Sequence, residues 1–191
     1  MTTGIILASA SPRREQLLRQ VGCDFRVLPS MAEENNEAAL SPSELVREHA
    51  RAKAQDVARD VSPNDIVIGA DTIVVLDGRV YGKPGDETQA CKMLGELSGK
   101  VHSVWSGIAV VGNGMCITDA VETRVTLSEL TSVQIQRYAA TGEPLDKAGA
   151  YAVQGFGAVF VEKIEGCYFN VVGLPLHALA RLLSKVGVDL L

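Results

Sequence analysis

The chain contains 191 residues, of which 47% are hydrophobic, and it carries a net charge of −5 at pH 7. Such a length can bury a sizeable core as one domain, or as two lobes that share a cleft. The acidic balance argues against a dedicated DNA or RNA binder, because those proteins carry large basic surfaces. No apolar run reaches the roughly 18 residues that span a bilayer, and the N-terminus lacks the order of a signal peptide. We therefore expect a cytoplasmic protein that contacts neither nucleic acid nor a membrane.

The first informative segment is residues 4–14. An apolar strand over 4–8 leads into small hydroxylated residues and then into a helix that opens with two arginines. Small residues let the backbone approach a ligand, a helix start offers N–H groups, and guanidinium supplies forked donors. Ser11 fits the N-cap and Pro12 the first helical position. The segment predicts either a phosphate-binding turn or an ordinary strand-to-helix turn whose arginines face solvent.

The next segments alternate between helix and strand. Apolar residues at helical spacing predict a helix that ends at Gly22, and a strand follows over 25–29. Residues 31–40 are polar and acidic and predict a loop. The sequence Ser41-Pro42-Ser43-Glu44 fits a capping box and predicts a helix that extends to about Arg59.

A short apolar run over 66–70 predicts a buried strand that ends at Asp71 and Thr72. Asp77-Gly78 predicts a hairpin turn. The remaining expected elements are a helix over 86–97, strands over 101–112 and 115–127 joined by Asn113-Gly114, a helix over 132–140, a ligand-facing loop over 142–157, two strands flanking 165–166, and a helix from about Pro175. Early alternation followed by hairpins predicts an α/β fold with a mixed, strongly twisted sheet.

Asp71 is the strongest single candidate for chemistry. Ionisable side chains rarely end a buried strand, and ligands of α/β sheets bind beyond the carboxyl ends of strands. An aspartate there can hold a divalent cation or accept a proton from water, whereas an Asx-turn is the alternative interpretation. Glu33 and Glu34 in the acidic loop could complete a Mg²⁺ or Mn²⁺ site with Asp71, the alternative being an acidic surface loop.

Two lysines supply candidate positive charge. Lys53 lies on the capped helix, where a solvated face is the alternative, and Lys83 lies at a stiff hairpin exit between Gly82 and Pro84. Asp86 either caps the next helix or orients Lys83. The histidines lack the spacing of metal ligands, and we expect structural or surface roles for all three: His49, His102 and His177.

These cations and carboxylates are the functional groups needed for metal-assisted attack on a polyphosphate, in which cations bind oxygens and a carboxylate activates water. The sequence contains neither a Walker loop nor a histidine or cysteine in a phosphoryl-acceptor motif. Direct attack by water is therefore favoured.

These motifs resemble the Maf family of nucleoside triphosphate pyrophosphatases. The matching segments are residues 7–14, Ala52-Lys53-Ala54, Gly69-Ala70-Asp71-Thr72, Gly82-Lys83-Pro84 with Asp86, Leu97-Ser98-Gly99 with His102, and residues 142–151 followed by Gln154-Gly155. The resemblance implies one domain over residues 1–191, with an α/β fold similar to inosine triphosphate pyrophosphatases and two lobes around a cleft. It also implies a divalent metal and hydrolysis of a nucleoside triphosphate to the monophosphate and pyrophosphate, and a homodimer is a family expectation.

The resemblance also implies roles for individual residues. Asp71 would accept the proton from water. Arg13, Thr72 and Gln154 would determine which nucleotide is accepted. Phosphate would contact Ser9, Arg14, Lys53, Lys83 and Asp86, and the metal ligands would be Glu34 and Asp71, with Glu33 left open as an alternative to Glu34.

The family has one branch that acts on dTTP and UTP and another that acts on 7-methyl-GTP. Gln154 resembles the pyrimidine branch, because an amide can pair with both O4 and N3–H of uracil or thymine. His49 stands where leucine is frequent in the family, which we interpret as a packing change. A non-catalytic nucleotide-binding regulator of cell division is the competing hypothesis. The pairing of Asp71 with Glu34 favours catalysis, since anion binding gains nothing from carboxylates.

Overall fold

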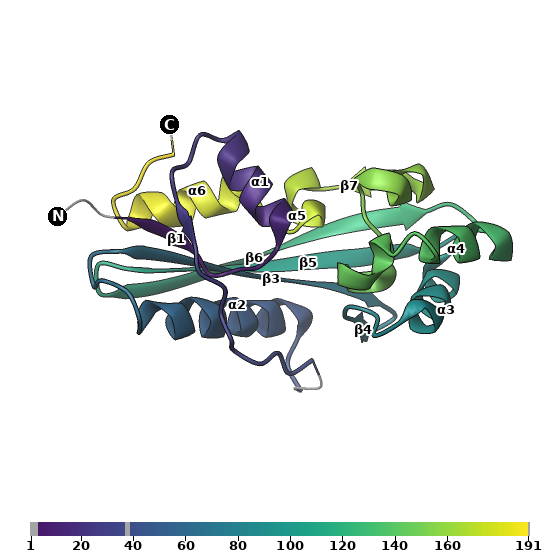
Figure 1. Cartoon of the computed structure of the whole chain (residues 1–191), viewed down its shortest axis with the longest axis horizontal. Coiled ribbons are helices and arrows are strands. Elements are labelled where there is room, and N and C mark those ends of the chain that lie inside the picture. Colours follow the sequence, from purple (N-terminus) through teal and green to yellow (C-terminus); the bar gives the residue numbers. More distant parts are fainter. Residues whose placement is uncertain (1–3, 37–38, 191) are drawn as a thin grey trace. The chain divides into compact units, whose positions relative to one another are not determined.

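Seven strands form one sheet in the computed structural model, which describes residues 4–36 and 39–190 (Figure 1). The strands are β1 (Ile5–Leu7), β2 (Arg26–Val27), β3 (Ile66–Leu76), β4 (Arg79–Tyr81), β5 (Val101–Gly112), β6 (Met115–Leu127) and β7 (Val161–Glu165). The α-helices are α1 (Pro12–Gln20), α2 (Pro42–Ala58), α3 (Glu87–Leu97), α4 (Ser132–Ala139), α5 (Tyr168–Val172) and α6 (Leu176–Lys185). Short 3-10 helices follow α4, and they are η1 (Glu143–Asp146), η2 (Ala148–Ala150) and η3 (Gly155–Phe160).

The sheet has the strand order β2-β1-β3-β5-β6-β7, and β4 pairs with β3 outside this path. Strand β1 is parallel to both β2 and β3, whereas β4 is antiparallel to β3 and β7 is antiparallel to β6. Pairs of both kinds make the sheet mixed, and helices alternate with strands through the first half of the chain. The predicted mixed α/β fold is therefore confirmed.

The chain divides into two compact units, as the family resemblance implies. Unit 1 comprises Met1–Asp71, Ser106–Val121 and Gly173–Leu191, and unit 2 comprises Thr72–Trp105 and Glu122–Val172. None of the helices in the described part of the chain has the length and apolar character needed to cross a bilayer.

In unit 1, helix α2 covers one face of the strands, and α1 and α6 cover the other (Figure 1). The core on the α2 face consists of Ile6, Ala8, Ala50, Ala54, Val57, Val67 and Ala109. Helix α2 begins with the predicted capping box, in which the Ser41 hydroxyl accepts from the Glu44 N–H and the Glu44 carboxylate accepts from the Ser41 N–H.

Two glycines let α2 approach the sheet closely. A Cβ atom on Gly69 of β3 would overlap the carbonyl oxygen of Ala50, and a Cβ atom on Gly107 of β5 would overlap that of Val46. Because a side chain at either strand position would displace the helix backbone, these glycines fix how near α2 lies to β3 and β5.

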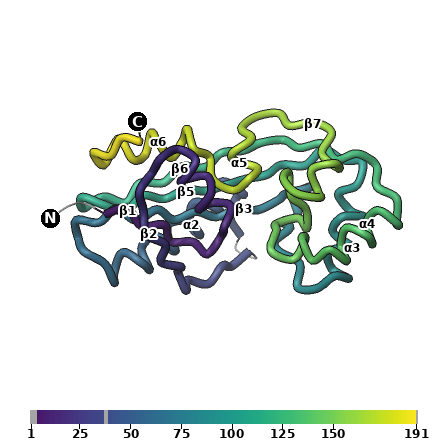
Figure 2. Tube along the Cα trace, turned by 45° about the horizontal axis from the view of Figure 1, so that its top comes forward, coloured from purple at the N-terminus to yellow at the C-terminus, as the bar shows by residue number. Residues whose placement is uncertain are grey.

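In unit 2, α3 and α4 lie side by side and pack with η1 and η2 (Figure 2). The core that they share with the strands includes Val104, Val125, Tyr138, Tyr151 and Phe160. The Tyr138 and Phe160 rings meet edge to face at 5.2 Å between centroids, a favourable aromatic geometry.

Two expected elements differ in the structure, and a third agrees with its prediction. Strand β3 does not end at Asp71 and Thr72 but continues to Leu76, because residues 72–76 are mostly β-branched and Val74 pairs with Tyr81 of β4. Residues 142–157, predicted as a loop, fold into η1, η2 and the start of η3. The expected loop over 31–40 has no helix or strand in its described part, and residues 37–38 lie outside the described residues.

The strand expected after residue 166 was also wrong, since residues 168–172 form α5. The Asn170 side chain is fully buried there and donates to the carbonyl oxygen of Val104 at 3.0 Å and to Oγ1 of Thr123 at 2.9 Å. Thr123 Oγ1 also accepts from the Cys167 N–H at 3.1 Å. These side-chain bonds take the place of a strand ladder at this position.

Candidate active site

Asp71 lies in the middle of β3, and its residue is only 4% exposed. Two side chains of α2 contact its carboxylate. His49 Nδ1 lies 3.0 Å from Asp71 Oδ2, and Lys53 Nζ donates to Asp71 Oδ1 at 2.7 Å. His49 and Lys53 are four residues apart and therefore project from the same face of the helix. The close approach that Gly69 permits, two residues before Asp71 on the same strand face, brings both donors within hydrogen-bond distance.

The Asp71 carboxylate is ionised in this setting. Burial opposes its charge, but the hydrogen bond from His49 and the charge of Lys53 outweigh burial and hold the pKa of Asp71 below its usual value. The hydrogen bond to Asp71 in turn raises the pKa of His49, against the opposing effect of burial. The imidazole N–H and the ammonium thus compensate a buried negative charge that would otherwise be costly.

The same two α2 residues also contact the acidic loop. Lys53 Nζ donates to Glu34 Oε1 at 2.5 Å, so one ammonium group bridges two carboxylates. The His49 imidazole makes a second hydrogen bond, to the backbone of Asn35. Of the two glutamates that the sequence left open, Glu34 is therefore the one that meets Lys53.

The start of this loop is tied to α2 as well. Asp56 Oδ2 accepts from the Ser30 hydroxyl at 2.7 Å and from the Met31 N–H at 2.9 Å. Because Asp56 and Lys53 lie about one helical turn apart, the loop before and at Glu34 is held along a single helix.

Arg14 and Ser9 lie beside this cluster, and both are buried. Arg14 Nη1 donates to Ser9 Oγ at 3.0 Å and to the Ala70 carbonyl at 2.9 Å, and Nε donates to the Gly173 carbonyl at 2.9 Å. Burial lowers the pKa of Arg14, although the nearby carboxylates of Asp71 and Glu34 oppose this effect. The guanidinium thus joins the turn after β1 to the residue that precedes Asp71.

The predicted N-cap at Ser11 forms without a side-chain bond. Ser11 has extended backbone dihedrals at the start of α1, but its hydroxyl makes no capping hydrogen bond. Its N–H is instead bonded to Ser9 Oγ at 3.3 Å. Arg13, the residue before Arg14, is half-buried.

Unit 1 therefore brings together five of the residues proposed for the site: Ser9, Arg14, Glu34, Lys53 and Asp71. Arg13 also belongs to unit 1. The other predicted residues belong to unit 2, and these are Thr72, Lys83, Asp86 and Gln154. Thr72 is half-buried in β3 and, as the neighbour of Asp71 in a strand, projects to the opposite face.

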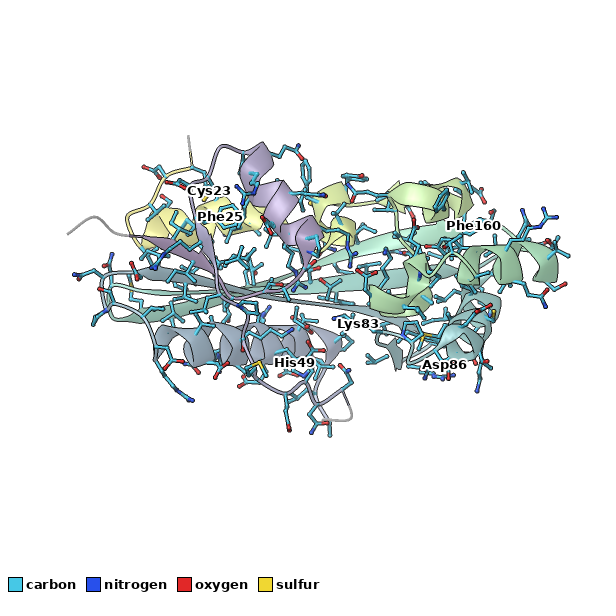
Figure 3. All side chains as sticks on the ribbon, viewed as in Figure 1. Cys23, Phe25, His49, Lys83, Asp86 and Phe160 are labelled. Atoms are coloured by element: carbon cyan, nitrogen blue, oxygen red, sulfur yellow. The ribbon has the colours of Figure 1, made fainter. Side chains whose placement is uncertain are left out.

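Lys83 and Asp86 lie on the segment between β4 and α3 (Figure 3). Lys83 is exposed. Asp86 is the N-cap of α3, and its Oδ1 accepts from the Gln89 N–H at 2.7 Å. Of the two alternatives stated for Asp86 in relation to Lys83, helix capping is confirmed.

Gln154 is half-buried and stands immediately before Gly155, whose φ of +69° favours glycine. The segment that follows is fixed by Glu143. Its carboxylate accepts from the N–H groups of Phe156 and Gly157, each at 3.0 Å, and from the Tyr138 hydroxyl at 2.9 Å. No pattern in the sequence indicates this anchoring role for Glu143.

A divalent cation would need oxygen ligands from this chain. In the part of the chain that the structure describes, no group of three or more histidine, cysteine, aspartate or glutamate side chains is arranged to hold a metal ion. The carboxylates of Glu34 and Asp71 nevertheless lie close together, because both form ion pairs with the Lys53 ammonium group. Mg²⁺ in phosphate-handling sites commonly uses one or two carboxylates and completes its shell with water and substrate phosphate, and this donor set fits that pattern.

The sequence analysis missed the contact between His49 and Asp71. The interpretation of His49 as a packing change is wrong, because the imidazole hydrogen-bonds to the Asp71 carboxylate. The available signal was its spacing of four residues from Lys53 on a capped helix, which puts both side chains on one face. Figure 3 labels His49 on α2.

The chain is similar to known proteins over most of its length. The family model described as Maf-like protein matches residues 4–186. A dTTP/UTP pyrophosphatase of Gloeobacter violaceus is 50% identical over 185 residues, with 97% of each chain covered. A dTTP/UTP pyrophosphatase of Dictyoglomus turgidum is 49% identical over 194 residues, with 100% of each covered. Among solved structures, the Staphylococcus aureus Ham1 protein gives a TM-score of 0.49 at 16% identity, covering 83% of this chain and 80% of its own.

Proposed function

Because the chain belongs to the Maf family, we propose that it hydrolyses dTTP and UTP to the nucleoside monophosphate and pyrophosphate. Full-length relatives with about half of their residues identical are named for this activity. The observation that carries the proposal is the buried, ionised Asp71 carboxylate with Lys53 and Glu34 beside it. A site that only bound phosphate would use cations and N–H donors and would gain nothing from two carboxylates.

In the proposed reaction, water attacks the α-phosphorus and Asp71 accepts a proton from that water. The P–O bond to the leaving group breaks, and pyrophosphate departs. Lys53 and Arg14 would stabilise the negative charge on the phosphate oxygens, and the family resemblance implies the same role for Lys83. Lys53 is suited to this role because its ammonium is already shared between two carboxylates and has three rotatable donors.

Glu34 and Asp71 would hold the divalent cation, Mg²⁺ or Mn²⁺. When bound, such a cation neutralises phosphate charge and lowers the pKa of coordinated water. The low pKa of Asp71 keeps the carboxylate ionised at neutral pH and thus available for either role. Transfer of Lys53 from Asp71 to a phosphate oxygen would leave Asp71 more basic as substrate binds.

Selection of the base would depend on Gln154, together with Arg13 and Thr72. An amide both donates and accepts, so Gln154 can pair with O4 and N3–H of a uracil or thymine ring. The hydrogen bonds of Glu143 to the backbone just after Gln154 support a fixed rather than adaptable position for this amide.

Pyrophosphate release from dTTP, UTP and 7-methyl-GTP, each with Mg²⁺, with Mn²⁺ and with a chelator, tests the proposal. We expect turnover of the two pyrimidine nucleotides that requires a divalent cation. Asp71→Asn should reduce turnover roughly 100- to 10,000-fold, the range for loss of a general base. The matched control is Asp24→Asn, since Asp24 is exposed and its side chain lies outside this cluster.

Three results would contradict parts of the proposal. Near-normal turnover by Asp71→Asn would remove Asp71 as the proton acceptor. A strong preference for 7-methyl-GTP would overturn the role given to Gln154. Binding of dTTP without any release of pyrophosphate would favour a nucleotide-binding regulator over a hydrolase.

A further inference from the structure

The Asp71 carboxylate has two oxygen atoms, and each receives a different donor from α2. Lys53 Nζ binds Oδ1 at 2.7 Å, and His49 Nδ1 binds Oδ2 at 3.0 Å. The His49 side chain is 7% exposed and that of Asp71 is 5% exposed, so water does not compete freely for this bond. With a donor on each oxygen, rotation of the carboxylate about its χ2 angle is restricted.

The two donors differ in how firmly they are held. Lys53 carries its charge on a flexible stem and divides its ammonium between Asp71 and Glu34. His49 presents a rigid ring, packed at the interface of α2 and β3, with its other hydrogen bond made to the backbone of Asn35. If Lys53 moves to phosphate as proposed above, His49 is the donor on Asp71 that is still held in place.

We propose that His49 is a positioning residue for Asp71, which it holds in one orientation while fastening the Glu34 loop to the same carboxylate. This inference rests on the proposed function, since it assigns to Asp71 the acceptance of the proton. His49 itself touches neither water nor phosphate in this role. It acts through its hydrogen bonds to Asp71 and to the backbone of Asn35.

Two substitutions separate hydrogen bonding from packing. His49→Leu fills much of the same space without any donor. His49→Asn places an amide nitrogen where Nδ1 stands and so retains the donor to Asp71, while it loses the reach to Asn35. We expect His49→Leu to lower kcat for dTTP roughly 10- to 100-fold, the effect of losing one charge-assisted hydrogen bond. KM should stay within about twofold of the wild-type value, because His49 makes no contact with the substrate in this role.

His49→Asn should recover kcat to within roughly fivefold of the wild type, since the bond to Asp71 is restored without the second anchor. His177→Leu is the matched control, because it makes the same substitution at an exposed position of α6. That variant should keep the wild-type kcat and KM.

A second measurement on the intact protein reports the bond itself. In ¹⁵N-labelled wild-type protein, the Nδ1–H proton of His49 should give a downfield NMR resonance that exchanges slowly with water, as expected for a buried charge-assisted bond. The resonance should be absent from His49→Leu, and it should move upfield in Asp71→Asn, where the acceptor is neutral.

Four outcomes would overturn the proposal. A wild-type kcat in His49→Leu would show that Asp71 needs no such partner. Equal loss of kcat in His49→Leu and His49→Asn, with equal loss of thermal stability, would assign His49 to packing. A His49 resonance unaffected by Asp71→Asn would remove the bond on which the inference stands. Absence of pyrophosphate release by the wild type, with the resonance present, would overturn the proposed function and this inference with it.

Discussion

Acidification should destabilise the protein through His102, a buried histidine of β5. The residue is 3% exposed, and its Nε2 forms a 2.7 Å hydrogen bond with the hydroxyl of Tyr151. Its other ring nitrogen, Nδ1, is buried without a hydrogen-bond partner among the described residues. Burial lowers the pKa of His102 to about 4, because a proton added there would bring a charge that no neighbour compensates.

The size of the effect follows from this pKa. In the unfolded chain His102 titrates near 6.5, whereas in the fold it titrates near 4. Between these values the unfolded chain binds more protons, so the free energy of unfolding falls as the pH falls. For each pH unit of acidification in this window, the free energy of unfolding falls by about 1.4 kcal/mol. The contribution of His102 is therefore fully present above about pH 6.5, and about 3 kcal/mol is lost by pH 4.

Urea unfolding at pH 7, 6, 5 and 4 measures this loss. The informative variant is the double substitution His102→Phe with Tyr151→Phe, because replacing His102 alone would leave the Tyr151 hydroxyl buried without a partner. We expect the double variant to lose about 3 kcal/mol less than the wild type between pH 7 and pH 4. An equal loss in both proteins would refute the assignment, as would an NMR titration that places the pKa of folded His102 near 6.5.

Three further substitutions test the contacts that build unit 1, each by urea unfolding. Arg14→Lys should lower the free energy of unfolding by about 2–4 kcal/mol, because an ammonium cannot reproduce the three hydrogen bonds of the guanidinium. Its control is Arg19→Lys at an exposed position of the same helix, which should change the free energy of unfolding by less than about 0.5 kcal/mol. Gly69→Ala should lower the free energy of unfolding by about 1–3 kcal/mol and should lower turnover, because the added methyl group pushes α2 away from Asp71. Its control is Gly95→Ala on α3, where the methyl group meets open space, and this substitution should raise the free energy of unfolding by about 0.5–1 kcal/mol. Ser41→Ala should cost about 1 kcal/mol through loss of the capping box, and an unchanged midpoint would contradict that role.

Elements encoded by neighbouring residues could be predicted from the sequence. The capping box of α2 depends on Ser41 and Glu44 alone, and it forms as expected. The turn between β5 and β6 depends on Asn113-Gly114, whose φ angles of +50° and +74° suit those two residue types. Such signals are local, because every partner in the hydrogen bonds lies within a few residues.

The position of Asp71 within β3 could not be predicted in this way. The expectation that the strand ends there rested on the short apolar run, which stops at Ala70, and a carboxylate inside a buried strand is costly. The cost is met by His49 and Lys53, which are 22 and 18 residues away in the sequence. Since the sequence alone does not show which donors reach a strand interior, it could not show that β3 continues to Leu76.

The same reason explains the error after residue 166. Residues 168–172 contain tyrosine, phenylalanine and valine, which favour a strand by composition. The helix there depends on Asn170, whose amide bonds reach residues 47 and 66 positions away. A tertiary contact thus decides the local conformation against intrinsic preference.

The packing of α2 and the chemistry of Asp71 are two consequences of one contact. Gly69 removes the side chain that would hold the helix away, and Ala50 and Ala54 of α2 then pack against the sheet. His49 and Lys53, each the residue before one of these alanines, are thereby directed at the carboxylate two positions beyond Gly69. Leucine at position 49 would preserve the packing and lose the hydrogen bonds to Asp71 and to the backbone of Asn35. The donor on Asp71 Oδ2 can therefore be removed by substitution without removing the contact that brings Lys53 to the site.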